Sequence, residues 1–268
     1  RPKFIEYDCG GRQLVSVDSL NDDGNTLLVV SVEEINELKA AIRYLLDKGL
    51  VGIKAIYDRS DPHRPFRQEQ PYKGIADRAR ARAKSMISDA QLFDLIQFIR
   101  MTVDVPGAVA EYGSLHGGSG AVLAEALNFY GKKPLFLFDT FGGIPESKFG
   151  LDYRWSGAFS DNSYHEVKAA FSDLQNVTVV PGNILTTFDA IPGPLSFGYL
   201  ASDTLESGEL LLSYMWPKLS RGGILAVCDY GSYPNCLPLT VACDRFFEDK
   251  KDALIYYPDN FGIFAIKR

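Results

Sequence analysis

The chain has 268 residues, of which 46% are hydrophobic and 23% charged, and its formal net charge is −6. This composition is ordinary for a soluble globular protein, and the length allows one large domain with a small additional one. The negative charge argues against a nucleic-acid partner, because phosphate binding needs a basic surface. No apolar run approaches the roughly 20 residues that cross a bilayer, so no membrane partner is expected.

The cysteines and histidines point to no zinc site. Only three histidines are present, and the four cysteines (Cys9, Cys228, Cys236 and Cys243) form no Cys-x-x-Cys pair. A disulfide framework is also not expected in a chain of this size, and free thiols suit a reducing compartment. No secretory signal is visible, so the expected location is the cytoplasm.

The first 57 residues differ in pattern from the rest. Segments 13–17 and 26–30 are strand-like, with a polar turn between them, and 31–34 match a capping box ahead of a helical stripe that ends at Leu46. This pattern predicts a small ββα domain over residues 1–57.

Residues 58–104 lead into the main domain. Segment 58–74 is rich in Pro, Arg and Gln and has no periodicity, which indicates a linker or flap. A helix is expected over 76–100, packing on the core or covering it, and Val105-Pro106-Gly107 ends it.

From residue 105 to 268, strand-like and helical segments alternate, which favours a parallel sheet with helices on both faces. The last two strands are separated only by residues 258–260, which is too short for a crossover, so they should form an antiparallel hairpin. The expected strands are 108–112, 134–138, 177–180, 195–200, 223–228, 253–257 and 261–266, and the expected helices are 119–130, 163–173, 207–219 and 238–249.

A glycine-rich motif follows the first of these strands. The chain reads Glu111-x-Gly113 and then Gly117-Gly118-Ser119-Gly120, while the second strand ends in Asp139. Glycines let the backbone approach a ligand, and an acid after the second strand binds ribose hydroxyls. A dinucleotide fingerprint would need a third glycine where Leu123 stands, and no P-loop motif is present.

The motif instead resembles the first motif of class I S-adenosylmethionine (SAM) methyltransferases. Further segments resemble the macrocin/mycinamicin O-methyltransferase (TylF-like) family over roughly residues 80–268, with 1–57 outside the resemblance. The matching segments are 105–113, 117–119, Asp-Thr-Phe-Gly-Gly-Ile-Pro-Glu at 139–146, 180–183, Asp203-Thr204-Leu205-Glu206-Ser207 and 222–230.

This resemblance implies a Rossmann-like sheet of seven strands, SAM as cofactor, and methyl transfer to a hydroxyl of a sugar or other small natural product. It also implies a homo-oligomer. The residues that it assigns to SAM are Glu111, Gly113, Ser114, Gly117, Gly118, Ser119, Asp139, Thr140, Phe141 and Asn183.

The family activates its acceptor with Mg²⁺ held by carboxylates, and here the sequence departs from the family pattern. After the fourth strand the family has Asp-x-Asp, whereas this chain has Ala201-Ser202-Asp203. After the fifth strand the family has Asp-Asp-Tyr, whereas this chain has Cys228-Asp229-Tyr230. The first aspartate of each pattern is therefore missing. Asp203 and Asp229 remain as candidate metal ligands, substrate-orienting groups or bases. A thiol is a poor magnesium ligand.

His165 is a further candidate base, since it follows the aromatic loop 147–164, a plausible substrate lid. Three different functions stay open beside sugar O-methylation with Mg²⁺. One is that of a metal-independent N- or O-methyltransferase, whose activity survives EDTA. Another is that of a SAM-binding protein that serves as a non-catalytic partner. The last is that of an oxidative enzyme of the cephalosporin-hydroxylase type, against which the lack of a two-histidine-one-carboxylate set argues.

Overall fold

The structure is a computed structural model that describes residues 27–31, 35–50, 54–58, 70–232, 235–258 and 262–268. The chain divides into two compact units, Arg1–Lys73 and Gly74–Arg268. The border therefore falls inside the segment expected to link the domains, and residues 74–104 fold with the larger unit.

The described part of the smaller unit is a β-α-β arrangement. Strand β1 (Leu27–Ser31) pairs in parallel with β2 (Lys54–Asp58), and helix α1 (Ile35–Asp47) lies between them in sequence. Parallel strands need such a crossover. The strand expected at 26–30 and the helix after it are confirmed, β2 was not predicted, and the strand expected at 13–17 lies outside the described residues.

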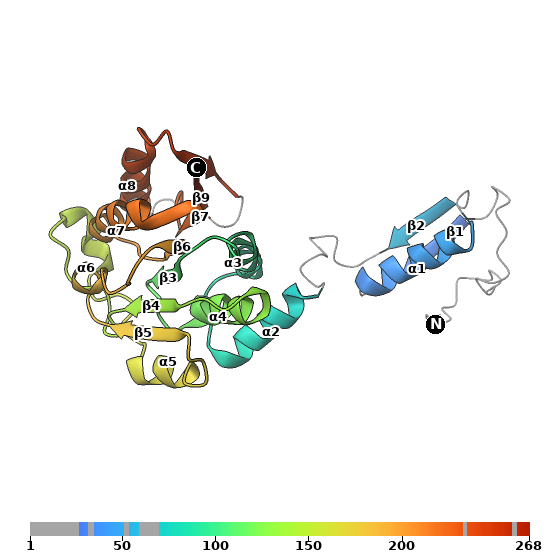
Figure 1. Ribbon diagram of the computed structural model, residues 1–268, viewed down its shortest axis with the longest axis horizontal. Helices are drawn as coiled ribbons and strands as arrows, with labels where there is room; N and C mark the ends of the chain where they lie inside the picture. Colours follow the sequence, from blue (N-terminus) through green and yellow to red (C-terminus); the bar gives the residue numbers. More distant parts are fainter. Residues whose placement is uncertain (1–26, 32–34, 51–53, 59–69, 233–234, 259–261) are drawn as a thin grey trace. The chain divides into compact units, whose positions relative to one another are not determined.

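The larger unit is built on one mixed sheet of seven strands in the order β5-β4-β3-β6-β7-β9-β8 (Figure 1). The five strands from β5 to β7 are parallel, and β9 is antiparallel to both of its neighbours. The predicted seven-stranded sheet with an antiparallel C-terminal hairpin is confirmed. The strands are β3 (Ala108–Tyr112), β4 (Leu135–Asp139), β5 (Val177–Pro181), β6 (Leu195–Leu200), β7 (Leu219–Cys228), β8 (Ala253–Tyr256) and β9 (Gly262–Lys267).

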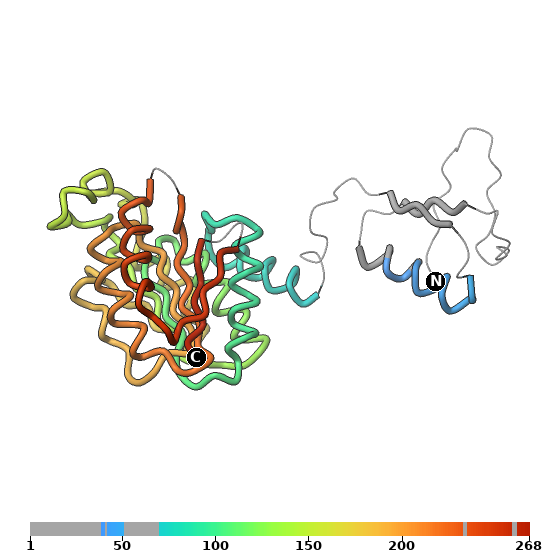
Figure 2. The backbone as a smooth tube through the Cα atoms, turned by 90° about the horizontal axis from the view of Figure 1, so that it is seen from above, coloured from blue at the N-terminus to red at the C-terminus, as the bar shows by residue number. Residues whose placement is uncertain are grey.

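Helices cover both faces of this sheet, and Figure 2 shows the strands running between the α2–α4 group and the α7–α8 group. Helix α3 packs on α4, and α7 packs on α8. Ala110 and Tyr112 of β3 join Leu211 and Met215 of α7 in one buried apolar cluster. The helices are α2 (Tyr72–Arg82), α3 (Asp89–Met101), α4 (Gly118–Tyr130), α5 (Tyr164–Ala170), α6 (Ile184–Thr187), α7 (Leu205–Lys218) and α8 (Leu237–Phe247), with a 3-10 helix, η3, at Gly150–Trp155.

The single helix predicted over 76–100 is wrong, because α2 and α3 are separate. Ser88 caps α3: its hydroxyl accepts from the Gln91 backbone N–H, and the Gln91 side chain accepts from the Ser88 N–H. This capping box starts a new helix. The segment between the helices passes close over Gly118, where a Cβ atom would overlap the backbone of Lys84 and Ser85.

Among the described residues, no helix combines the length and the apolar character that crossing a bilayer requires.

Candidate functional site

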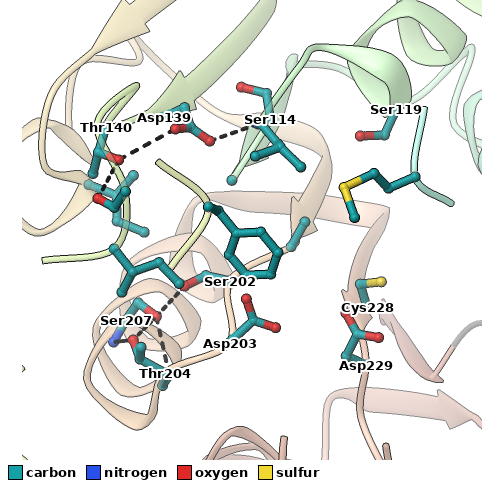
Figure 3. Close-up of a pocket in the computed structure, with 18 of the residues that line it drawn as sticks. Ser114, Ser119, Asp139, Thr140, Ser202, Asp203, Thr204, Ser207, Cys228 and Asp229 are labelled. Carbon is teal, nitrogen blue, oxygen red and sulfur yellow. Dashed lines mark hydrogen bonds between the residues drawn. The ribbon is translucent and has the colours of Figure 1, made fainter. Parts of the chain in front are cut away.

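A cavity of about 310 Å³ opens at the carboxyl ends of the parallel strands of the larger unit (Figure 3). Residues at or just after the ends of β3, β4, β6 and β7 all contribute to its wall, among them Ser114, Asp139, Asp203 and Asp229. The chain order of the sheet reverses between β3 and β6, and ligands of open α/β sheets bind at such a switch point. The cavity thus lies where this fold binds ligands.

Gly113 brings the ends of β3 and β6 together. Its φ is +99°, and a Cβ atom there would overlap the carbonyl oxygen of Ala201. The Ala201 N–H donates to the Tyr112 carbonyl at 2.9 Å, which continues the pairing of the two strands to the cavity. Any side chain at position 113 would push these strand ends apart.

The Asp139 carboxylate is held rigidly by backbone and side-chain donors. Its Oδ2 accepts from the Leu115 N–H at 2.7 Å, while Oδ1 accepts from the Phe141 N–H at 2.8 Å and from Asn162 Nδ2 at 3.0 Å. A carboxylate oxygen accepts about two hydrogen bonds. Oδ2 therefore retains capacity for a ligand hydroxyl.

Glu111 lies behind the cavity rather than in its wall. It is fully buried, and one of its oxygens accepts a short hydrogen bond from the Ser119 hydroxyl. The other oxygen, Oε2, has no hydrogen-bond partner among the described residues. Burial raises the pKa of Glu111 to about 8, against the opposing effect of Ser119. At neutral pH this carboxyl is mostly protonated and supports Ser119, which does line the cavity.

Two carboxylates and a thiol meet at the other end of the cavity. One ligand atom each of Asp203, Asp229 and Cys236 lies within 4.8 Å of the others. The Cys236 thiol donates to Asp203 Oδ1 at 3.6 Å. Burial, and then the charge of Asp229, raise the pKa of Asp203 to about 6.

Asp229 directly follows β7, and its backbone is in the left-handed conformation, with a φ of +61°. Asp is one of the few residues other than Gly that visit this region at modest cost. The turn directs its carboxylate to the same space as that of Asp203 (Figure 3).

The donor set does not suit Mg²⁺. Magnesium prefers six oxygen ligands in octahedral geometry and binds thiols poorly. Here the third ligand atom is the Cys236 sulfur, Ala201 lines the cavity without any side-chain ligand atom, and the buried Cys228 adds a second thiol beside Asp229 (Figure 3).

The structure brings most of the predicted site residues together. Those that line the cavity are Gly113, Ser114, Gly118, Ser119, Asp139, Thr140, Asn183, Asp203 and Asp229. Glu111, Gly117 and Phe141 lie next to the lining residues, with Gly117 in the left-handed conformation at the N-cap of α4. His165 is not in the cavity wall: it is exposed on α5, where its ring lies 5.5 Å from that of Tyr164.

The motifs of the sequence did not predict the lining residues from the segment between α2 and α3, namely Lys84, Met86 and Ile87. The capping box at Ser88 was the available signal, since it separates this segment from a continuous helix.

A mixed seven-stranded sheet with a glycine-rich turn after β3 and an acid at the end of β4 defines a class I SAM-dependent methyltransferase. The family model described as Macrocin-O-methyltransferase (TylF) matches residues 26–264, so the chain belongs to this family. The prediction of a SAM-dependent O-methyltransferase for a sugar or other natural-product hydroxyl is confirmed at the level of the family. The match also covers part of residues 1–57, which were expected to lie outside it.

Solved structures share the fold at low sequence identity. The O-methyltransferase NovP is 23% identical with a TM-score of 0.62, over 73% of this chain and 88% of NovP. The calicheamicin methyltransferase CalS11 is 17% identical with a TM-score of 0.56, over 88% of this chain and 94% of its own. The Podospora anserina methyltransferase PaMTH1, solved with bound SAH, is 13% identical with a TM-score of 0.52, over 88% and 98% of the two chains. A search of curated proteins found no match.

Replacing Glu111 with Gln should change how stability depends on pH. The folded-state pKa of Glu111 is raised from 4.5 to about 8, so between these values the folded protein holds a proton that the unfolded chain has released. The contribution of Glu111 to stability is therefore lost as pH rises through this window. Within this window, the free energy of unfolding of Glu111→Gln should rise relative to that of the wild type by up to about 1.4 kcal/mol per pH unit.

Urea unfolding at a series of pH values measures this difference, with Glu248→Gln, an exposed carboxyl, as control. Parallel curves for wild type and Glu111→Gln would contradict the burial argument.

Proposed function

We propose that the glycine-rich turn and Asp139 form the SAM end of the cavity. In this proposal Gly113, Gly118 and Ser119 admit the methionine part, and Asp139 Oδ2 takes a ribose hydroxyl. Thr140 and Phe141 follow Asp139, and Asn183 borders the adenine. The supporting observation is the position of the Asp139 carboxylate. It accepts hydrogen bonds from two backbone N–H groups, and one of its oxygens can still accept a hydrogen bond from a ligand.

We propose that the acceptor hydroxyl lies at the Asp203–Asp229 end, and that Asp203 is the general base. The SAM methyl group is already electrophilic, so the protein must align the hydroxyl with the sulfonium and remove its proton. As the oxygen–methyl bond forms and the sulfur–methyl bond breaks, the proton passes to Asp203, and S-adenosylhomocysteine leaves. A base with a pKa of about 6 is ionised at neutral pH yet more basic than an ordinary carboxylate.

Asp229 assists Asp203 in two ways in this proposal. Its negative charge, 4.8 Å or less away, raises the basicity of Asp203. Its own carboxylate accepts a hydrogen bond from a neighbouring acceptor hydroxyl, which fixes the orientation of the sugar.

We further propose that methyl transfer proceeds without Mg²⁺. Support comes from the Cys236 sulfur, which is the third ligand atom beside Asp203 and Asp229, and from Ala201 and Cys228, which line the cavity at the two positions where the family pattern has aspartate. These side chains favour a metal-independent methyltransferase with a hydroxyl as the acceptor.

An oxidative enzyme of the cephalosporin-hydroxylase type gains no support. Among the described residues the group of three metal-ligating side chains contains no histidine, which does not suit an iron oxygenase. The exposed position of His165 does not favour it as a base. A homo-oligomer and a cytoplasmic location stay predictions.

Asp139→Asn should weaken SAM binding by about tenfold or more, because an amide nitrogen would face the N–H donors that now meet a carboxylate. Calorimetric titration with SAM measures the change. Asp161→Asn, an exposed carboxyl near His116, is the matched control and should bind SAM normally. Unchanged affinity in Asp139→Asn would contradict the proposed ribose contact.

Asp203→Asn should lower kcat by about 10²- to 10⁴-fold, the usual range for a lost general base, while the Kd for SAM stays within twofold. In the wild type, kcat/KM should rise with pH to a plateau above about 6, because protonated Asp203 cannot accept the proton. The assay follows S-adenosylhomocysteine release over a panel of free and nucleotide-linked sugars. Retained kcat in the variant would reject Asp203 as base.

EDTA should leave the activity of the metal-stripped wild type unchanged, and added Mg²⁺ should raise it less than twofold. Calorimetry of the SAM-saturated protein with MgCl₂ should record no binding heat. Ala201→Asp/Cys228→Asp, which restores two oxygen ligands, provides the positive comparison. Loss of wild-type activity in EDTA, with recovery on Mg²⁺, would reject the metal-free proposal.

A further inference from the structure

Asp152 is a buried carboxylate for which the proposed chemistry has no role. It lies in the 3-10 helix η3, is 2% exposed, and does not line the cavity. A charge in such a place is costly unless hydrogen bonds compensate for the lost water. The partners of Asp152 therefore explain why it is there.

Those partners lie at the start of α7, more than 50 residues further along the chain. Asp152 Oδ1 accepts from the Leu205 N–H at 2.8 Å, and Oδ2 accepts from the Glu206 N–H at 3.2 Å. The first N–H groups of a helix lack partners within it and lie at the positive end of its dipole. Thr204 Oγ1 accepts from the next one, that of Ser207, at 3.2 Å. Asp152 thus completes the cap of α7 from another part of the chain.

The same carboxylate holds its own loop. The Ser147 hydroxyl donates to Asp152 Oδ2 at 2.8 Å, and the Lys148 N–H donates to the Glu206 carboxylate at 3.2 Å. Ser147 and Glu206 both line the cavity, one from each side of this junction. The junction therefore joins two walls of the proposed acceptor end.

Asp203 stands two residues before Leu205, so its position depends on where α7 begins. A helix whose first N–H groups lose their acceptors frays in its first turn. A displacement of about 1 Å in a reacting group costs about 10²-fold in rate. The ends of β3 and β4, with Gly113 and Asp139, share no hydrogen bond with Asp152 among those described.

We propose that Asp152 is a positioning residue for methyl transfer, which fixes Asp203 and the loop of Ser147 relative to each other through the N-terminus of α7. This inference rests on the proposed function of Asp203. It makes Asp152 a determinant of acceptor use and not of SAM binding.

Hydrogen exchange of the SAM-bound full chain, with Asp152→Ala and Asp152→Asn, tests the junction without any acceptor. Both variants should speed exchange of the amides of 204–207 and of 147–149 at least tenfold, while the Kd for SAM stays within twofold. Asp152→Asn should have the smaller effect, because its remaining carbonyl oxygen still accepts from Leu205. Asp252→Ala is the control: Asp252 accepts from Trp216 Nε1 at 3.2 Å and does not line the cavity.

With the sugar of that panel that gives the highest wild-type rate, Asp152→Asn should lower kcat/KM at least tenfold, and Asp252→Ala less than twofold. Unchanged exchange at both segments, or SAM binding weakened as much as kcat/KM, would overturn the proposal. The two proposals can fail separately. Retained kcat in Asp203→Asn would reject Asp203 as the general base, whereas the hydrogen exchange of the Asp152 variants does not depend on whether Asp203 is the base.

Discussion

The contact between the backbone after β3 and the backbone after β6 organises this molecule. Gly113 allows it, because only a residue without Cβ fits against the carbonyl of Ala201. The two strands are neighbours in the sheet although residues 113–194 lie between them in the chain, and their ends diverge into the glycine-rich turn and the turn of Asp203. The close approach thus places the proposed cofactor and acceptor groups within one cavity.

Burial affects the carboxyl groups in and behind this cavity to different degrees. Asp139 is surrounded by hydrogen-bond donors. Asp203 and Glu111 are partly or wholly removed from water, and their pKa values rise. In the proposed function, carboxyl groups therefore serve three tasks: a hydrogen-bond acceptor at Asp139, a base at Asp203 and a mostly neutral support at Glu111.

The sheet of the larger unit could be predicted from sequence because its central strands are buried on both faces and read as continuous apolar runs. The motifs at Gly113 and Asp139 lie at strand ends, so predicting the strands also placed much of the site. What the sequence did not reveal depends on contacts between distant segments. Asp152 looks like any polar loop residue until Leu205 and Glu206 lie beside it. His165 was expected to be a base from its place after an aromatic loop, but the direction of a side chain from α5 is set by packing.

The backbone allows different sets of residues at positions 201, 228 and 229. Positions 201 and 228 do not have the positive φ of Asp229, so their backbone admits almost any residue, and exchange between a carboxylate and an alanine or cysteine meets no conformational barrier. At 229 the left-handed backbone restricts the choice largely to Gly, Asn and Asp. The backbone therefore leaves the side chain open to change at two of these three positions of the cavity wall, while the third is restricted by the turn that follows β7.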